Sequence, residues 1–382
     1  MHVISAPATP GHHHSSIKYA QYYQSSLFAP TPLERKSRMH DPKENTLERS
    51  LLVTGGQGFL GSSLVKALVA LGFKHVAATV RREAPELEAL GVEVVHADLT
   101  DREQVRTAVA GRRVVFHTAA KAGVWGDFDS YFRINVEATR HLLEAAAESG
   151  VGHFIHTSSP SVTFQGKPSE QKTEQADYGR QPLNPYCATK IESERLVLEG
   201  DWGMRVLALR PHLIYGPGDP HLLPRVYEAA RSGRLVRVGD GLNQVDVTHI
   251  VDAVGSQLCA LSKLEDDSAW GEAYFITSGH PIRLWSWIAH LLHWQSLSPV
   301  KKSIPVSLGY RLGDILERIY SRIDRGEPPL TRFSALQLGL THTYSIEKAR
   351  RLLGYAPSVH PYAPFEEQFE REPDWACFKG LF

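Results

Sequence analysis

The chain has 382 residues, enough for one large domain or two closely joined ones. Its 42 basic and 42 acidic residues cancel, so the overall charge gives no indication of nucleic acid or an anionic membrane as a partner. No apolar run reaches the roughly 18 residues that an integral membrane segment needs. The three cysteines are odd in number and far apart, which predicts a reducing, cytoplasmic location without a disulfide framework.

Residues 1–48 differ in composition from the rest of the chain. Proline, serine and the run His12-His13-His14 are prominent, and no apolar period is present. We interpret this stretch as a disordered N-terminal extension, since three neighbouring histidines on an unstructured segment chelate a metal poorly, and we predict no metal site. Because it is poor in acidic residues, a transit-like segment remains open, as does a protein start at Met39.

From residue 50 onward, short apolar runs alternate with amphipathic segments, the pattern of a parallel sheet with crossover helices. The expected strands are Ser50–Thr54, His75–Val80, Glu93–His96, Arg113–His117, His153–Ser158 and Arg205–Arg210. The expected helices between them are Phe59–Leu71, Asp101–Ala110, Phe128–Ser149 and Pro185–Glu199. We therefore predict an α/β fold with a doubly wound parallel sheet of the Rossmann type.

After Arg210 the alternation becomes less regular, and a proline- and glycine-rich loop follows at residues 215–220. We predict a Rossmann domain at residues 49–211, with residues 235–277 partly contributing. A smaller substrate-binding region is expected at residues 212–234 and 278–382. The expected elements here are helices at Leu222–Ser232, Ile282–Trp294, Ser307–Ile323 and Ser345–Leu353 and a strand at Leu235–Gly239.

The first strand leads directly into a glycine turn that opens a helix. Gly55 permits the tight turn, Gly58 lets a pyrophosphate approach the backbone, and Gly61 allows close packing of helix on strand. The helix begins at Phe59-Leu60, where free N–H groups attract phosphate. This position in a βαβ unit predicts a dinucleotide cofactor.

The second strand ends in Thr79-Val80-Arg81-Arg82, where an NAD enzyme usually has an acidic residue. A guanidinium pairs with a 2′-phosphate, so Arg81 favours NADP(H), with NAD(H) still possible. The alternatives are that the two arginines are merely solvated, or that Glu83 supplies the acid.

Two further strand ends are expected to contact the cofactor. Asp98 and Leu99 follow the third strand, where Asp98 could reach the adenine amino group; helix capping is its alternative role, although Thr100 or Asp101 fits that better. Ala119 and Ala120 follow the fourth strand and leave room for the cofactor.

The chemistry is expected from three side chains. Tyr186 and Lys190 are four residues apart on one helix face, and a lysine cation should lower the pKa of the phenol towards working pH. Asn184 is the expected N-cap of this helix, with Pro185 at its first position. Ser159 is our first choice for a hydroxyl that binds the substrate oxygen, followed by Ser158 and then Ser161.

The glycine motif, the serine loop and Tyr186-x-x-x-Lys190 together resemble the extended short-chain dehydrogenase/reductase superfamily, from residue 50 to about 357. The resemblance implies that Tyr186 protonates the substrate oxygen, Lys190 holds the nicotinamide ribose, and Ser159 orients the carbonyl. Asn135 matches the family asparagine that holds a relay water or a helix kink. Arg210-Pro211 with Tyr215-Gly216-Pro217 matches the loop beside the nicotinamide.

Within this superfamily the chain resembles the 3β-hydroxysteroid dehydrogenase branch, and more narrowly the 2-alkyl-3-oxoalkanoate reductases of bacterial long-chain olefin biosynthesis. Four blocks carry this resemblance: residues 119–126, 157–162, 210–221 and 328–333. The resemblance implies NADPH-dependent reduction of a β-keto acid with two long alkyl chains.

Four residues are candidates for substrate contacts. Lys121 would attract a carboxylate or could be a solvated loop lysine, and Trp125 would line an alkyl pocket or fill the core. Ser161 and His212 complete the set. In the expected helix Ser307–Ile323, an apolar stripe could line an acyl tunnel or touch a membrane surface, but we favour ordinary core packing; its residues are Leu308, Leu312, Ile315 and Ile319.

Three alternatives to the keto acid reductase remain. They are an NAD(P)-dependent hydroxysteroid or sterol dehydrogenase, a nucleotide-sugar epimerase or dehydratase, and a non-catalytic cofactor-binding scaffold. The family resemblance also implies a homodimer through Phe128–Ser149 and Pro185–Glu199, and membership of a multi-enzyme assembly is possible.

Overall fold

The computed structural model describes residues 46–323, 326–370 and 373–382, all within one compact unit. The predicted extension at residues 1–48, with its histidine run, lies almost entirely outside the described residues. The boundary between a Rossmann domain and a substrate region stays a prediction.

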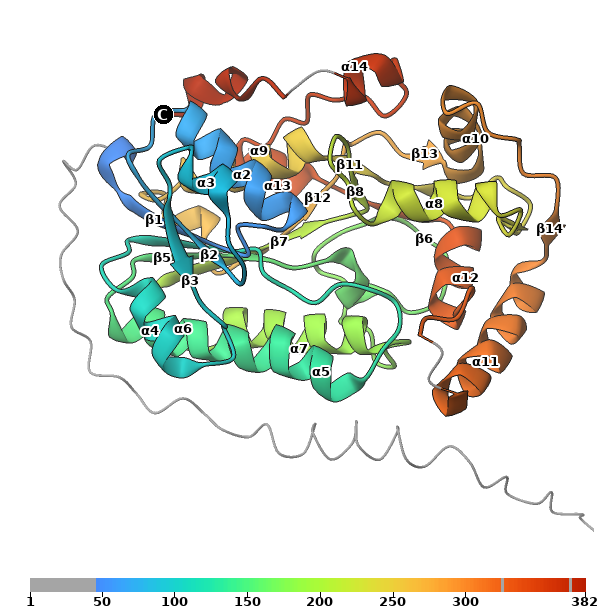
Figure 1. The fold of residues 1–382 in the computed structure, drawn as a ribbon, viewed down its shortest axis with the longest axis horizontal. Helices are drawn as coiled ribbons and strands as arrows, with labels where there is room; N and C mark the ends of the chain where they lie inside the picture. The colour runs from blue at the N-terminus through green and yellow to red at the C-terminus, as the bar shows by residue number, and fades with distance from the viewer. Residues whose placement is uncertain (1–45, 324–325, 371–372) are drawn as a thin grey trace, which may run out of the picture. The chain divides into compact units, whose positions relative to one another are not determined.

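Seven parallel strands form the central sheet, in the order β12-β7-β5-β4-β1-β2-β3 (Figure 1). The strand order reverses at β1, which places the β1–β4 neighbours at the switch point where α/β folds bind ligands. The fold class predicted from the sequence is confirmed. The strands are β1 Ser50–Thr54, β2 His75–Val80, β3 Glu93–His96, β4 Val114–His117, β5 His153–Thr157, β7 Arg205–Pro211 and β12 Ala273–Ile276.

Both faces of the sheet are covered by helices, so the strands are apolar on both sides. Alternate residues of one strand enter different cores: Leu51 and Val53 pack with α2 and α9, whereas Leu52 packs with α4 and α6 (Figure 1). The helices of this layer system are α2 Phe59–Ala70, α3 Pro85–Glu88, α4 Arg102–Val109, α5 Phe128–Phe132, α6 Ala138–Glu148, α7 Pro185–Glu199, α9 Ile250–Leu261 and α13 Glu347–Leu353.

The remaining elements form a second region with its own core around Trp285 and Trp287. Its helices are α8 Leu222–Arg231, α10 Leu284–Trp294, α11 Val306–Ile323, α12 Arg332–Gly339 and α14 Phe365–Phe369. A four-stranded sheet joins β13 Ile282–Arg283, β10 Gln244–Val245, β15 His342–Tyr344 and β6 Ser169–Lys172. Two short pairs join β8 Ile214–Tyr215 with β11 Thr248–His249, and β9 Arg237–Val238 with β14 Ser303–Ile304.

The expected helix Phe128–Ser149 is interrupted in its first half. Between α5 and α6, residues Arg133–Glu137 form a π-helical turn, η2. Short 3₁₀ turns occur at η1 Thr46–Glu48, η3 Pro160–Thr163, η4 Asp267–Ala269 and η5 Trp375–Leu381.

The expectation of core packing for the apolar stripe of α11 is wrong. Leu308, Leu312, Ile315 and Ile319 are all exposed. The face of α11 that enters the core instead contains Gly309, Gly313 and Glu317. Small residues allow α11 to approach α12 so closely that a Cβ at Gly313 would lie 2.6 Å from the backbone nitrogen of Arg332.

Candidate active site

The glycine turn after β1 forms a close-packed cradle. Gly55 has a φ of +71°, which favours glycine. A Cβ at Gly61 would collide with the carbonyl oxygen of Gly55, so the start of α2 must pass directly against the turn. Gly58 is the N-cap residue of α2, and the free N–H groups of Phe59 and Leu60 follow it. This cradle fits a pyrophosphate at a helix N-terminus.

Two residues in the same turn have roles that the sequence did not reveal. A Cβ at Gly56 would lie 2.7 Å from the Cβ of Ala78, so β2 also requires glycine here. The side chain of Gln57 accepts a hydrogen bond from the backbone N–H of Arg81 at 3.3 Å and donates to the carbonyl of Glu83 at 3.0 Å. Gln57 therefore fixes the segment after β2 beside the glycine turn.

Arg81 is exposed at the carboxyl end of β2, as expected for a group available to a ligand. Asp98 lies nearby: hydrogen bonds from the backbone and side chain of Thr100, followed by the charges of Arg81 and Arg133, hold its pKa below the usual value. Asp101 caps α4 by accepting from the N–H of Glu103 at 2.9 Å. The contact of Asp98 with adenine remains a prediction.

The other expected cofactor residues lie at neighbouring strand ends. Ala119 lies so close to the glycine turn that a Cβ added at Gly55 would be 3.0 Å from the Cα of Ala119. The backbone N–H of Ala119 donates to Thr54 Oγ1 at 3.2 Å. Ala120 is exposed, and Pro211 ends β7. Leu99 packs against the core on the α4–α6 side of the sheet.

Helix α7 starts as its sequence predicts. The Asn184 side chain accepts from the N–H of Cys187 at 2.8 Å, and Pro185 occupies the first helical position. This start fixes Tyr186 in the first turn and Lys190 one turn later, both facing the carboxyl ends of the strands.

Ser159 is the serine that lies against Tyr186. Burial raises the pKa of Tyr186 to about 12, while a hydrogen bond with the Ser159 side chain lowers it. Ser159 also caps η3 by accepting from the N–H of Ser161 at 3.2 Å. The expected lowering of the phenol pKa towards neutrality by Lys190 is therefore wrong, since desolvation dominates.

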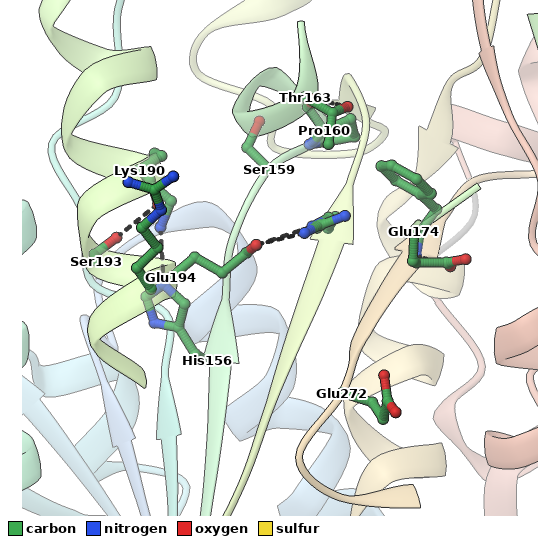
Figure 2. A network of polar contacts seen from close by, with 12 residues as sticks. His156, Ser159, Pro160, Thr163, Glu174, Lys190, Ser193, Glu194 and Glu272 are labelled. Atoms are coloured by element: carbon green, nitrogen blue, oxygen red, sulfur yellow. Dashed lines mark hydrogen bonds and ion pairs between the residues drawn. The ribbon is translucent and has the colours of Figure 1, made fainter. Parts of the chain in front are cut away.

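Lys190 points into the sheet rather than along the helix (Figure 2). Its Nζ donates to the carbonyl of Thr157 at 2.7 Å and lies 3.3 Å from Nε2 of His156. Burial lowers the pKa of this lysine to about 8, and Glu194, one turn further along α7, opposes that shift.

The histidine beneath Lys190 belongs to a buried polar cluster that was not predicted from the sequence. Parallel register pairs His156 of β5 with His117 of β4, and their rings are 5.3 Å apart. His117 is hydrogen-bonded on both ring nitrogens, to Thr54 at 2.8 Å and Thr139 at 2.9 Å. The sequence contained one signal of this cluster, namely a histidine at the end of the apolar strand β4 and another near the end of β5.

Asn135 lies inside the π-helical turn and joins three segments. Its Oδ1 accepts from the N–H of Lys121 at 2.7 Å, and its Nδ2 donates to the carbonyl of Lys121 at 3.1 Å and to Thr189 at 3.0 Å. Its side chain thereby ties the loop after β4 to α7 in the turn between Tyr186 and Lys190.

A buried ion pair holds α7 on the sheet. Arg210 of β7 donates two hydrogen bonds to Glu194, at 2.9 and 2.5 Å, and the two side chains are 4% and 0% exposed. Figure 2 shows Glu194 on α7 pointing toward the strands. Glu194 continues the face of Tyr186 and Lys190 by a further turn. The local sequence marks Arg210 only as the end of a strand and as part of a loop motif, and it does not single out Glu194.

The structure distributes the expected substrate residues around this centre. Lys121 donates to Ser130 at 2.6 Å and lies over the ring of Tyr131, so its ammonium is engaged within the protein. Trp125 is partly buried. Among the described residues, His212 Nε2 is buried without a hydrogen-bond partner, the condition of a polar group that can receive a ligand, whereas Ser161 lies in hydrogen-bond contact with the thiol of Cys187.

A glycine cradle at the switch point, beside a serine, tyrosine and lysine at the same sheet edge, defines a nicotinamide-dependent short-chain dehydrogenase/reductase. Residues 52–306 match the model of the 3-beta hydroxysteroid dehydrogenase/isomerase family. The chain belongs to this family and is an NAD(P)-dependent oxidoreductase of the extended type.

Curated relatives include the 2-alkyl-3-oxoalkanoate reductase of Stenotrophomonas maltophilia, 44% identical over 81% of this chain and 95% of that protein. The sterol-4-alpha-carboxylate 3-dehydrogenase, decarboxylating, of Mus musculus is 32% identical over 80% of this chain and 86% of that protein. Among solved structures, the UDP-glucuronic acid 4-epimerase of Bacillus cereus in complex with NAD has a TM-score of 0.64 and 25% identity, and covers 87% of this chain and 99% of its own.

Proposed function

We propose that the protein reduces a 2-alkyl-3-oxoalkanoate to the 2-alkyl-3-hydroxyalkanoate with NADPH. The observation that carries the proposal is the hydrogen bond between Ser159 and Tyr186, with Lys190 one helical turn away. The substrate class comes from the 44% identical reductase, of which the chain covers 95%. Membership of an olefin-forming assembly in the cytoplasm belongs to the same proposal.

Each residue of the centre has a distinct task. Bound NADPH would supply the hydride. With a pKa of about 12, the Tyr186 phenol is protonated at neutral pH and can donate its proton to the ketone oxygen. Ser159 donates a hydrogen bond to the same oxygen and orients the carbonyl. Lys190 would hold the nicotinamide ribose, and the Ser159 hydroxyl, whose hydrogen bond lowers the pKa of Tyr186, would stabilise the phenolate that remains.

The apolar residues beside Tyr186 suit a substrate with alkyl chains. Phe164, Cys187, Phe333 and Leu336 form one buried cluster, with Val124 of the loop after β4 packed against it. Cys187 is the neighbour of the catalytic tyrosine, so an alkyl chain lying on this cluster brings the keto group to Tyr186. Trp125, Ser161 and His212 are the proposed contacts beyond it, and Lys121 is the weaker candidate because Ser130 already binds it.

A homodimer is the proposed assembly. Extended members of the superfamily would pair through the helices corresponding to α5–α6 and α7, as the sequence resemblance implies. On this proposal Tyr186 and Lys190 lie on an interface helix, and dimer contacts would steady the catalytic face.

A sterol or hydroxysteroid dehydrogenase is the second candidate, favoured by the 32% identity to the mouse sterol enzyme. It would use the same tyrosine, lysine and serine in alcohol oxidation. The nucleotide-sugar epimerase alternative shares the fold, but Arg81 stands where those enzymes would need an acidic residue for the NAD ribose. A non-catalytic scaffold would not need the Ser159–Tyr186 pair.

The test follows NADPH absorbance with a 2-alkyl-3-keto acid, in parallel with a 3-ketosteroid. We expect oxidation with the keto acid and a fall in kcat of at least about 100-fold in Tyr186→Phe. Tyr362→Phe, which alters an exposed tyrosine outside the site, should leave kcat unchanged. Turnover of the steroid alone would move the function to the second candidate, and full activity of Tyr186→Phe would refute the mechanism.

Cofactor choice is tested separately with Arg81→Ala. Loss of a guanidinium that pairs with a 2′-phosphate should raise the KM for NADPH roughly tenfold or more and leave the KM for NADH nearly unchanged. Arg82→Ala is the matched control, for which we expect the smaller change. Equal effects of Arg81→Ala on both cofactors would contradict the proposed preference.

A further inference from the structure

Two histidines with unpartnered ring nitrogens lie side by side near the catalytic loop. His212 follows β7 and His342 begins β15; they are 7% and 0% exposed, and their ring centroids are 5.0 Å apart. Among the described residues, neither Nε2 atom has a hydrogen-bond partner. Because a buried polar atom without a partner is costly, two adjacent ones mark a place where a ligand can complete the hydrogen bonds.

Both rings are held by the segments that carry them. The backbone N–H of His212 donates to the carbonyl of Ile276 at 3.2 Å, and its own carbonyl accepts from Thr248 Oγ1 at 2.8 Å. His342 Nδ1 lies 2.9 Å from the carbonyl oxygen of Leu340, which can only accept. The ring proton of His342 is therefore on Nδ1, and Nε2 presents a bare lone pair.

A lysine shares the sheet face of His342. Strands β15 and β6 pair in parallel, with His342 opposite Ser169 and Tyr344 opposite Lys172, and the register shifts between the two pairs. The extra residue in β6 turns Lys172 to the face on which His342 and Tyr344 lie, since alternate residues of a strand share one face. Burial lowers the pKa of His342 to about 4, and the charge of Lys172 adds to this lowering.

The ammonium of Lys172 is half-buried and has no counter-charge. Its Nζ donates to the carbonyl of Thr163 at 2.8 Å, and burial lowers the pKa of this lysine. No carboxylate of a described residue forms an ion pair with it. Thr163 is the last residue of η3, and Ser159 is the N-cap at the start of that turn (Figure 2). A cation that needs an anion is thus fixed to the loop that carries the catalytic serine.

We propose that His212, His342 and Lys172 form the receptor for the carboxylate of the substrate. The inference rests on the proposed function, because it assigns one group of the proposed keto acid to this place. In a β-keto acid a single carbon separates the carboxylate from the ketone. Its receptor must therefore adjoin the groups that bind the ketone oxygen, Ser159 and Tyr186.

The receptor also borders the apolar cluster beside the catalytic tyrosine. The ring of Phe164 lies 6.2 Å from that of His342, and Phe164 belongs to the same buried cluster as Cys187, the neighbour of Tyr186. A substrate whose alkyl chain lies on this cluster would have its polar end at the two histidines. The three kinds of group in the keto acid thus have adjoining places in the protein.

Each member of the receptor contributes differently. Lys172 supplies the charge. No hydrogen bond to a described residue fixes the tautomer of His212, so its neutral ring can donate from Nε2. At His342 the incoming anion favours the imidazolium, so binding places a proton on Nε2. The titratable groups that surround His342 are Lys172 of β6, His212 after β7, Tyr344 of β15, Asp246, which accepts from the N–H of Tyr344, and Cys187 of α7.

The test compares a 2-alkyl-3-keto acid with the dialkyl ketone that lacks only its carboxylate, each with saturating NADPH. Lys172→Met keeps the apolar stem and removes the charge. It should raise the KM for the acid at least about tenfold and leave the KM for the ketone and kcat nearly unchanged. His212→Phe, which keeps a ring against His342, should raise the KM for the acid roughly fivefold.

The role of His342 is tested by pH. In the unaltered chain, the ratio of the KM for the acid to the KM for the ketone should rise at least about threefold from pH 6 to pH 8, because binding the acid takes up a proton. His342→Phe should remove this rise, and its turnover of the ketone would show that the variant is folded. A rise that persists in His342→Phe would overturn the role of this histidine.

The matched control is Lys167→Met, which alters an exposed lysine between η3 and β6. It should leave both KM values unchanged. An equal change of both KM values in Lys172→Met would overturn the receptor and leave the reductase function standing. Absence of turnover of either substrate by the unaltered chain would overturn the proposed function, and the receptor with it.

Discussion

At the scale of single residues, His156, the side chain beneath Lys190, has the most informative environment. Lys190 is a buried cation with two acceptors, the Thr157 carbonyl and His156 Nε2. Burial holds the pKa of His156 well below its ordinary value, so the ring is neutral and its Nε2 can accept. Around the pair lie His117 of β4, which adds to the lowering, and Glu194 of α7, which supports the lysine charge. His156 is thus a positioning residue for Lys190.

Replacement of this histidine should change the pH profile. His156→Leu removes one acceptor from the Lys190 ammonium, so the lysine pKa, already lowered to about 8, should fall further. If the charged lysine is the active form, the alkaline limb of the kcat profile should move to lower pH by about one unit, a penalty of roughly 1.4 kcal/mol on the charged form.

His156→Gln serves as the conservative variant, since its side-chain oxygen can accept in place of Nε2. This variant should return the alkaline limb of the kcat profile most of the way to its original pH. A leucine variant with the original profile and a lower kcat at every pH would show that His156 has only a packing role.

At the scale of elements, the attachment of α7 to β7 depends on one buried ion pair. Glu194→Gln would leave the buried Arg210 guanidinium without its ion-pair partner, with only the more distant charge of Glu174 to offset it, which we expect to cost about 3–5 kcal/mol in the free energy of unfolding. The measurement is the urea midpoint at neutral pH. Because Tyr186 and Lys190 lie on the same helix, kcat should fall as well.

The matched variant is Glu199→Gln on the same helix. Its carboxylate is 66% exposed and lies 3.9 Å from Arg195, so its loss should change stability by less than about 0.5 kcal/mol. Equal effects of the two substitutions would show that the buried pair is not what holds α7.

At the scale of the whole molecule, buried histidines set how stability depends on pH. A histidine whose pKa is lowered on folding stabilises the fold above its unfolded pKa of about 6.5, and this contribution is lost as the pH falls. Burial lowers the pKa of five such rings, to about 3 for His117, to about 4 for His249 and His342, and well below the ordinary value for His156 and His212.

Two buried carboxyls act with the opposite sign. Burial raises the pKa of Asp246 to about 7 and of Asp252 to about 6, so their neutral forms favour the fold and their contribution is lost as the pH rises through these values. Because five histidines act in one direction and two carboxyls in the other, the net effect is a loss of stability as the pH falls. We therefore expect the unfolding temperature to be highest near pH 7 and to fall steadily below pH 6, as scanning fluorimetry from pH 8 to pH 4 would record.

His342→Gln should flatten this acid slope by up to about 1.4 kcal/mol per pH unit, because one titrating ring is removed. The exposed His75→Gln should leave the slope unchanged. An unfolding temperature that stays constant between pH 7 and pH 4.5 would contradict the assignment of the buried histidines as neutral.

Local patterns predicted most of the central sheet. Six strand ranges and the range of α7 agree with the structure to within a residue or so, because apolar runs bounded by glycine, proline and capping residues act over short distances. Helix α9 and strand β12 were not predicted. Eleven of the twelve residues of α9 are buried, so the helix has no solvent-exposed polar face to indicate it.

For this protein, the sequence by itself determined the glycine turn, the Tyr186–Lys190 face and the preference for Ser159, since each depends on residue type at a fixed local spacing. Only the tertiary structure decided that His156 lies under Lys190, that Glu194 pairs with Arg210, and that the stripe on α11 faces solvent. These features depend on strand register and on which helix face packs inward. Both are set by contacts between residues far apart in the chain, and a periodic pattern shows that a helix has an apolar face without showing what covers it.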